Sequence, residues 1–336
     1  MLTGKMVFAS GQYGDFDIFL LDLATNRLSQ LTSDQYWNDY PRLSPDAHQV
    51  AFTSARGDRQ EIRVMNVDGG NSRSVTPDLP FAAFPCWSPD GKQLAFVSTQ
   101  YFKADLFTLE LETGKVRRLT SSPHSDTYPD WSPDGKKIAF CSQRGMNQDI
   151  YLLELDALKE ERITTRPGPD TSPAFSPDGK KIAFVSQRSQ TKEGFRLLDS
   201  LWDFFYGAED LEIWVVELGS GKLRQITTDR GVDRNVRWSP DGAYLAFTHS
   251  TQGSDAQIKI CEYETGKGIP FSYDREPLRR ELERPLDVAG LTKAMTEYSP
   301  VLHKWTPGFV EKFLQRVGKR ELDQIYSPAE RYLDWR

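Results

Sequence analysis

The chain has 336 residues, and its formal net charge of −6 and sequence pI near 5.4 argue against a nucleic-acid-binding protein, which needs a basic surface. Its mean hydropathy is −0.56 and no run of 18 apolar residues occurs, so we expect no transmembrane segment. Aromatic residues nevertheless make up 12% of the chain, and 24 glycines and 20 prolines are spread along it. Many rings in a polar, turn-rich chain favour short, half-buried strands.

The cysteines and the start of the chain carry no processing or metal-binding pattern. Cys86, Cys141 and Cys261 lie far apart in apolar strand patterns, so we interpret them as small buried residues rather than as disulfide partners or zinc ligands. The first ten residues run directly into a strand pattern and lack the apolar core of a signal peptide. Either the protein is not exported, or a leader has been removed.

The chain contains an internal repeat. A Ser-Pro-Asp-Gly motif, with Ala47 in place of glycine at its first occurrence, recurs at spacings of 44, 44, 44 and 63 residues. A second marker extends the series toward the N-terminus, and its members are Phe8, Phe52, Phe96, Phe140, Phe184 and Phe247. The series therefore comprises six units, and the fifth unit carries an insertion of 19 residues.

Each unit predicts four short strands. An aromatic run such as Tyr128–Ser132 leads into a tight Pro-Asp-Gly turn, in which proline presets φ and glycine accepts a positive φ. The segments Lys137–Ser142 and Asp149–Leu155 form the second and third strands, and a fourth follows, as at Val116–Thr120. Four strands in about 44 residues are typical of a β-propeller blade, so we expect an all-β, six-bladed propeller over residues 1–271.

The unit Tyr-Pro-x-Trp-Ser-Pro-Asp-Gly-Lys-Lys-Ile-Ala-Phe, read at residues 128–140, resembles the TolB-type β-propeller repeat. That repeat also occurs in the propellers of prolyl-oligopeptidase and dipeptidyl-peptidase relatives and of tricorn-like proteases. The resemblance covers about residues 5–271 and implies protein partners, often at the bacterial cell envelope. We expect neither the N-terminal domain of TolB nor a hydrolase domain, because no Gly-x-Ser-x-Gly motif occurs and residues 272–336 are too few for one.

The first blade requires a strand from elsewhere. Counting back one repeat from Ser44 places the innermost strand of that blade before Met1, which would leave the ring with an open edge. We expect the C-terminal extension to close the ring, with the strand near residues 298–303, because Tyr298-Ser299-Pro300 resembles Thr171-Ser172-Pro173. The alternative is that an N-terminal strand has been lost.

Two segments depart from the repeat. The insertion at about residues 190–209, between the second and third strands of blade five, has apolar residues at helical spacing. It is interpreted either as a protrusion that docks a partner or a membrane surface, or as a segment packed on the protein's own C-terminal extension. Its candidate partner-binding residues are Phe195, Leu198, Leu201, Trp202, Phe205 and Tyr206. Residues 272–336 carry helix signals, including Thr306-Pro307 as a helix start, and predict a helical C-terminal extension that clips the ring. The alternative is an arm for a partner or a second copy.

One set of polar residues could carry chemistry. Asn38, Asp126, Asp170 and Asp233 stand at matching positions in the loops that enter the first strands, where a propeller opens its channel. Converging there, with Asp130 and Arg237 nearby, they could hold Ca²⁺ or another divalent cation, or serve as an acid–base pair. The competing interpretation, which we favour, is that they stabilise turns.

These observations leave two functional hypotheses. The first is a non-catalytic propeller that binds a protein or peptide through the channel mouth and the aromatic insertion, with homodimerisation through the insertion as a variant. The alternative is a propeller enzyme, a hydrolase or lyase that uses carboxylates at the channel mouth, with or without a divalent metal. The motif search assigns no catalytic residue and no nucleotide-binding loop.

Overall fold

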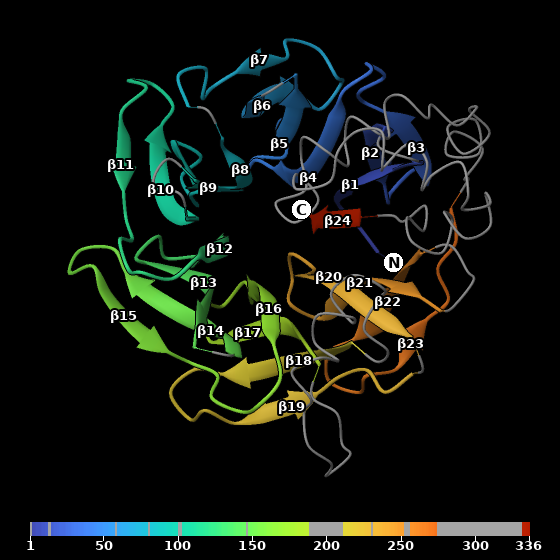
Figure 1. The fold of residues 1–336 in the computed structure, drawn as a ribbon. Coiled ribbons are helices and arrows are strands. Elements are labelled where there is room, and N and C mark those ends of the chain that lie inside the picture. The colour runs from blue at the N-terminus through green and yellow to red at the C-terminus, as the bar shows by residue number, and fades with distance from the viewer. Residues whose placement is uncertain are drawn as a thin grey trace, which may run out of the picture.

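In the computed structural model, the chain forms a closed ring of six four-stranded sheets around a central channel (Figure 1). The structure describes residues 2–12, 15–57, 59–79, 81–99, 103–145, 147–187, 211–229, 231–251, 256–273 and 331–336. The predicted six-bladed propeller is confirmed. Among these residues, no helix is long and apolar enough to span a membrane.

Blades one to three contain the first half of the chain, together with one strand from its end. Blade one consists, from the channel outward, of β24 (Arg331–Trp335), β1 (Lys5–Gln12), β2 (Asp15–Asp22) and β3 (Arg27–Gln30). Blade two consists of β4 (Trp37–Leu43), β5 (Gln49–Arg56), β6 (Arg59–Asn66) and β7 (Arg73–Ser74). Blade three consists of β8 (Ala83–Trp87), β9 (Gln93–Ser98), β10 (Asp105–Glu110) and β11 (Val116–Arg118).

Blades four to six repeat the same order. Blade four consists of β12 (Asp126–Trp131), β13 (Lys137–Arg144), β14 (Asn147–Glu154) and β15 (Lys159–Arg162). Blade five consists of β16 (Asp170–Phe175), β17 (Lys181–Ser186), β18 (Glu212–Glu217) and β19 (Leu223–Gln225). Blade six consists of β20 (Val232–Trp238), β21 (Tyr244–Ser250), β22 (Gln257–Glu262) and β23 (Gly268–Ile269).

The core lies between neighbouring blades. The repeated phenylalanine of each second strand is at most 4% exposed, and the three cysteines are buried free thiols, as expected. Tryptophans at the ends of inner strands tie adjacent blades together: Trp87 Nε1 donates to the Arg42 carbonyl at 2.9 Å, and Trp238 Nε1 donates to the Ala174 carbonyl at 3.1 Å. Many of the chain's aromatic side chains thus pack between neighbouring sheets.

The Ser-Pro-Asp-Gly motif forms the turn between the first and second strands of a blade. In blade four, Ser132 Oγ donates to Asp134 Oδ1 at 2.6 Å, and Gly135 takes a φ of 73°. The hydrogen bonds from Ser132 and the Lys136 amide hold the pKa of Asp134 below its ordinary value. These local bonds satisfy the backbone at the turn, which explains why the four residues recur together.

Each inner strand of blades two to six contains a β-bulge at one repeated position. The residue there has a positive φ of 52–57° and interrupts the pairing register with the second strand. The five residues are Tyr40, Phe84, Tyr128, Ser172 and Asn235. Positive φ is unusual for bulky side chains, so the three aromatic positions carry backbone strain.

The innermost strand of blade one comes from the end of the chain. β1 pairs with β2 on one side and with β24 on the other, with Met6 opposite Trp335 and Val7 opposite Asp334. β24 therefore occupies the position that we expected for residues 298–303, which lie outside the described residues. The correction has a sequence basis, because Tyr332-Leu333-Asp334-Trp335 repeats the pattern of Tyr128-Pro129-Asp130-Trp131 in another inner strand.

Of the predicted helical extension, only residues 331–336 fall in the described part of the chain, and they form a strand. The side chain of Asp334 connects this strand to blade two through a hydrogen bond and an ion pair. Its Oδ2 accepts the Leu43 amide at 2.8 Å, and its Oδ1 lies 3.5 Å from Arg42 Nη1 and 3.7 Å from Arg237 Nε. Burial alone would raise the pKa of Asp334, but Arg336, Arg42 and Arg237 together with the Leu43 amide hold this pKa below its ordinary value.

We predict that Asp334→Asn lowers the free energy of unfolding by about 3 kcal/mol at neutral pH, because it leaves buried guanidinium groups without their carboxylate. Since the folded-state pKa is depressed, the stability from Asp334 is present above the unfolded-state value of about 3.9 and is lost as pH falls through the folded-state pKa. Denaturant unfolding across this range should show the difference from wild type shrinking in acid. Asp156→Asn, in an exposed turn, is the matched control; an equal loss there would contradict the assignment.

Candidate functional site

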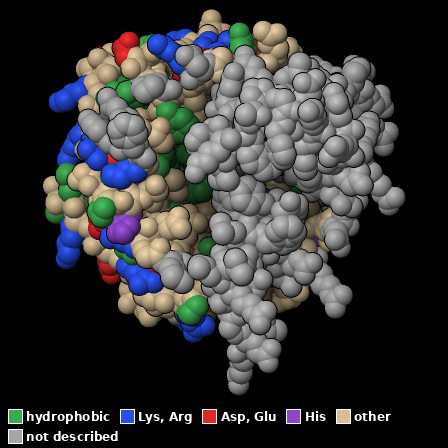
Figure 2. Space-filling model, in the orientation of Figure 1, with side chains coloured by type: hydrophobic (Ala, Val, Ile, Leu, Met, Phe, Trp, Pro, Cys, Tyr) green, Lys and Arg blue, Asp and Glu red, His purple; other side chains and the backbone are tan. Residues whose placement is uncertain are grey.

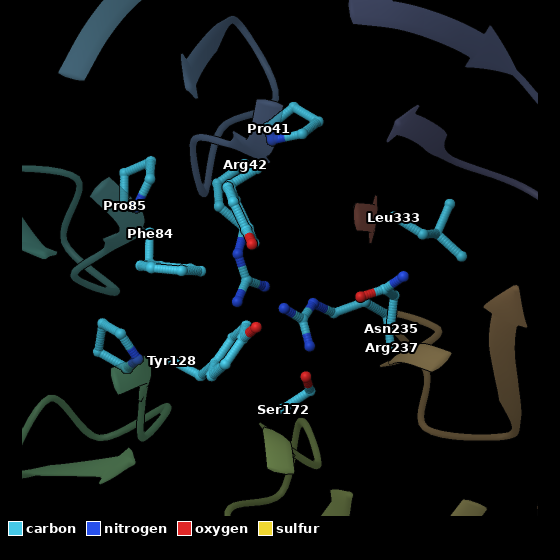
Figure 3. Close-up of a pocket in the computed structure, with 11 residues that line it drawn as sticks. Pro41, Arg42, Phe84, Pro85, Tyr128, Ser172, Asn235, Arg237 and Leu333 are labelled. Carbon is cyan, nitrogen blue, oxygen red and sulfur yellow. The ribbon is translucent and has the colours of Figure 1, made fainter. Parts of the chain in front are cut away.

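The five bulge residues bring their side chains to the channel. They line a hollow together with Pro41, Arg42, Pro85, Pro129, Arg237 and Leu333, which come from the inner strands of five blades and from β24 (Figure 3). We call this set the channel mouth. The bulge explains the geometry, since an extra residue in a strand redirects the side chain that would otherwise alternate along the sheet.

Three aromatic rings form one side of the channel mouth. The centroids of Tyr40 and Phe84 lie 4.1 Å apart, and those of Phe84 and Tyr128 lie 4.7 Å apart. The rings are tilted at 60° and 59°, and each of the three residues is half-buried. Burial raises the pKa of Tyr128 above its ordinary value, so this phenol stays protonated at neutral pH.

Two arginines lie across from the rings. Figure 3 shows the guanidinium groups of Arg42 and Arg237 turned toward each other and toward Tyr128 and Ser172. Arg42 Nη2 lies 3.5 Å from Asp130 Oδ1, and the two arginine side chains are 13% and 14% exposed. Asp130 Oδ2 in turn accepts the Phe175 amide at 2.8 Å, the same inter-blade bond that Asp334 makes to Leu43. Asp130 and Arg237 thus do lie together in the channel.

The channel mouth is nearly filled by its own side chains. The hollow has a cavity volume of about 20 Å³, which is close to the room that one water molecule needs. Figure 2 shows hydrophobic side chains gathered toward the middle of the ring, with many lysines and arginines along the visible rim. A ligand at this site would lie across the mouth and insert only a small group.

The four residues predicted to ring the mouth are placed differently. Asn38, Asp126, Asp170 and Asp233 are each at most 1% exposed and bond within their own blades. Ser54 Oγ donates to Asn38 Oδ1 at 2.8 Å and Ser186 Oγ donates to Asp170 Oδ1 at 2.6 Å. The expected convergence is not observed, and within the described residues no group of three or more His, Cys, Asp or Glu side chains is placed to hold a metal ion.

Blade six varies this pairing. His249 replaces the serine of the second strand, and its Nδ1 lies 2.6 Å from Asp233 Oδ1. A side chain at Gly231 would approach the His249 ring within 2.8 Å, so glycine there makes room for the imidazole. Burial raises the pKa of Asp233, and the hydrogen bonds from Thr227 and His249 oppose that rise. These side chains join strands β20 and β21 in the way that serine does elsewhere.

The residues predicted to bind a partner in the insertion, Phe195, Leu198, Leu201, Trp202, Phe205 and Tyr206, lie outside the described residues. The flanks of the insertion are described: Ser186 at the end of β17 pairs with Glu212 at the start of β18, and Asp170 pairs with Ser186. The insertion therefore leaves blade five beside the start of its inner strand, on the face at which the inner strands begin.

Asp126 and Asn38 occupy the same position in blades four and two, so they test how a buried carboxyl group and a buried amide at that position affect stability. Burial raises the pKa of Asp126, and its Oδ1 has no hydrogen-bond partner in the described part of the chain. Asn38 at the same position donates through Nδ2 to Asp34 Oδ1 at 2.7 Å and to the Tyr36 carbonyl at 3.1 Å. The side-chain amide of Asn38 in blade two therefore has hydrogen-bond partners, whereas one oxygen of the Asp126 carboxyl group at the same position in blade four has none among the described residues.

We predict that Asp126→Asn stabilises the protein by on the order of 1 kcal/mol at pH 7, and that Asn38→Asp destabilises it. Because the folded-state pKa of Asp126 is raised, the stability from its protonated form is present below the unfolded-state value of about 3.9 and is lost as pH rises through the folded-state pKa. Thermal melts should therefore show the gain from Asp126→Asn at neutral pH fading in acid. A gain that is independent of pH would contradict this account.

Comparison with known proteins supports the fold. Residues 82–197 match the family model described as the TolB beta propeller domain. A stretch of 60 residues of this chain is 35% identical to tricorn protease homolog 1 of Streptomyces coelicolor. The stretch makes up 18% of this chain and 6% of that protein. The structure of TolB from Acinetobacter baumannii superposes with a TM-score of 0.64 at 20% identity, over 78% of this chain and 62% of that chain.

A structure of oligogalacturonate lyase in complex with manganese also superposes, with a TM-score of 0.54 at 17% identity, over 80% of this chain and 74% of that chain. The chain thus spans less than two thirds of the tricorn homolog and of TolB. The two structures share the fold with this chain, and one is a TolB protein whereas the other is an enzyme.

Proposed function

We propose that this chain, a six-bladed β-propeller of TolB-type repeats, is a non-catalytic binding protein that holds a protein or peptide segment across its channel mouth. The observation that carries the proposal is the strained aromatic cluster of Tyr40, Phe84 and Tyr128. Half-buried tyrosine and phenylalanine rings around a polar centre are the residues that anchor peptide ligands.

The strain at these positions supports a role in binding. A positive φ costs a bulky residue roughly 1–3 kcal/mol, whereas asparagine adopts it readily. Blades five and six place Ser172 and Asn235 at the same position, so the bulge itself does not require a ring. Keeping three rings in this conformation is explained if their exposed edges contact a ligand.

The aromatic insertion is a second part of the proposal. It departs from blade five on the face at which the inner strands begin, so a partner that lies across the mouth can reach it. Its five rings within residues 195–206 have no counterpart in the other blades. We propose that they extend the contact with the partner, or with a second copy of the chain.

The enzyme alternative has less support. Oligogalacturonate lyase has the same fold, but the described carboxylates at this channel are already engaged: Asp130 and Asp334 bond to backbone amides and face arginines. Asp126, Asp170 and Asp233 are buried in their blades. A carboxylate that acts on a substrate must reach the reacting atom.

The proposal predicts a loss of peptide binding when the rings are removed. An array of random hexapeptides, each presented once with a free C-terminus and once attached through it, selects ligands whose affinities are then measured by fluorescence polarisation. We expect the triple change Tyr40→Asn, Phe84→Asn and Tyr128→Asn to weaken binding at least about tenfold, since each aromatic contact contributes on the order of 1 kcal/mol.

Ser172→Asn is the matched control, because it places the same residue at the same position in blade five without removing a ring, and it should weaken binding far less than the triple change. Thermal melts of all variants verify the fold, which asparagine at positive φ should preserve. Selected peptides that bind the triple variant as tightly as the wild type would refute the channel mouth as the site.

The insertion is tested separately. Trp202→Ala with Phe205→Ala should weaken binding of a selected peptide, or abolish a dimer seen by light scattering, while leaving the melting temperature unchanged. If neither changes, the insertion has no part in binding.

A further inference from the structure

We propose that the channel mouth receives a carboxylate of its ligand on Arg42 and Arg237. This inference rests on the proposed function and specifies the chemistry of the group that enters the mouth. Both guanidinium groups point into the hollow, and their arrangement is the observation that distinguishes this channel from a purely apolar one (Figure 3).

The charges in the channel leave an excess of cations. Arg42 and Arg237 face Asp130 and Asp334, and the exposed Arg336 at the end of β24 also acts on Asp334. Among the described residues, these three guanidinium groups share two carboxylates, and Arg234 and Asp39 near Tyr128 add one charge of each sign. An additional carboxylate would balance the charge of the channel, which is the condition that favours buried ions.

The hydrogen bonds show that the arginines have donors to spare. Arg237 Nη1 donates to the Val236 carbonyl at 2.7 Å, but its buried Nε has no hydrogen-bond partner among the described residues and lies 3.7 Å from Asp334 Oδ1. Arg42 reaches its two carboxylates only at 3.5 Å. A guanidinium group has five N–H donors, and carboxylates bind it best through two short bonds.

The two aspartates are held away from the arginines by other bonds. One oxygen of each accepts a backbone amide at 2.8 Å, from Phe175 for Asp130 and from Leu43 for Asp334. These bonds fix the carboxylates on the inner strands of the next blades. Within the described part of the chain, these two acids therefore leave the arginines incompletely satisfied.

The two arginines also act on each other. Burial, followed by the nearby charge of Arg42, lowers the pKa of Arg237 to about 10. Both groups remain charged at neutral pH, and their mutual repulsion is relieved by an anion placed between them. The cavity of about 20 Å³ has room for about one water molecule, so a carboxylate can place only one oxygen in it. The end of a chain or of an acidic side chain meets this limit.

The test compares three forms of one mouth-binding peptide, labelled with fluorescein at its N-terminus. The first has a free C-terminal carboxylate, the second a C-terminal amide, and the third an amide with aspartate as the last residue. Fluorescence polarisation on the wild-type protein should show one of the two carboxylate forms binding at least about tenfold more tightly than the neutral amide. The tighter of the two identifies the source of the carboxylate.

Arg237→Gln should remove this preference, so that the charged and neutral peptides bind with equal affinity, and Arg237→Lys should restore part of it. Arg59→Gln, which removes an exposed arginine on blade two, is the control and should keep the preference. Equal affinities of the charged and neutral peptides for wild type would overturn this inference and leave the proposed function standing. If no selected peptide depends on the mouth rings, both are overturned.

Discussion

The pairing of β24 with β1 is the contact on which the rest of the ring depends. Every other blade takes its four strands from one continuous stretch of chain, so its hairpins form through local turns. Blade one alone joins the two ends of the chain, and without β24 the strand β1 would present an open edge to solvent. Asp334 extends this closure to its neighbour, because its carboxylate binds the Leu43 amide of blade two.

The same inter-blade bond appears where the chain is continuous. Asp130 of blade four binds the Phe175 amide of blade five, as Asp334 binds Leu43. At the equivalent position the other blades place Arg42, Cys86, Ala174 and Arg237. Arg42 and Arg237 line the channel mouth, whereas Cys86 and Ala174 are buried in hydrophobic clusters. One repeated strand position thus both links the blades and determines the chemistry of the channel, and the closing strand contributes to each.

Most of the fold was predictable because the sequence pattern of one four-stranded blade recurs several times along the chain. The Ser-Pro-Asp-Gly turn and the buried phenylalanine recur at the same distance from each other in successive units. An ambiguous strand in one blade can therefore be assigned from the equivalent strands of the other blades. The closing strand was harder to place, because β24 lacks the Ser-Pro dipeptide that Ser299-Pro300 shares with Ser172-Pro173. Its Tyr-x-Asp-Trp pattern, shared with Tyr128–Trp131, was the signal that could have located it.

The channel mouth was less accessible to sequence reasoning. Tyr40, Phe84 and Tyr128 are residues that favour extended strands, so nothing in their type predicts a left-handed bulge. Asn38, Asp170 and Asp233 recur at the strand starts because each pairs with a side chain of the second strand in its own blade, which is serine in blades two and five and His249 in blade six. The positions that vary between constant neighbours, such as the bulge residue, were the better indicator of a site.

The pairing of β1 with β24 in blade one also affects when the ring can close during protein synthesis. The ribosome makes β24 more than three hundred residues after its partner β1. At roughly 5–20 residues per second, that interval is on the order of tens of seconds. During synthesis blades two to six can form their hairpins in turn, while the first sheet waits with one edge uncovered. Ring closure therefore waits until residues 331–335 have been made, and a nascent chain halted before residue 331 remains an open arc.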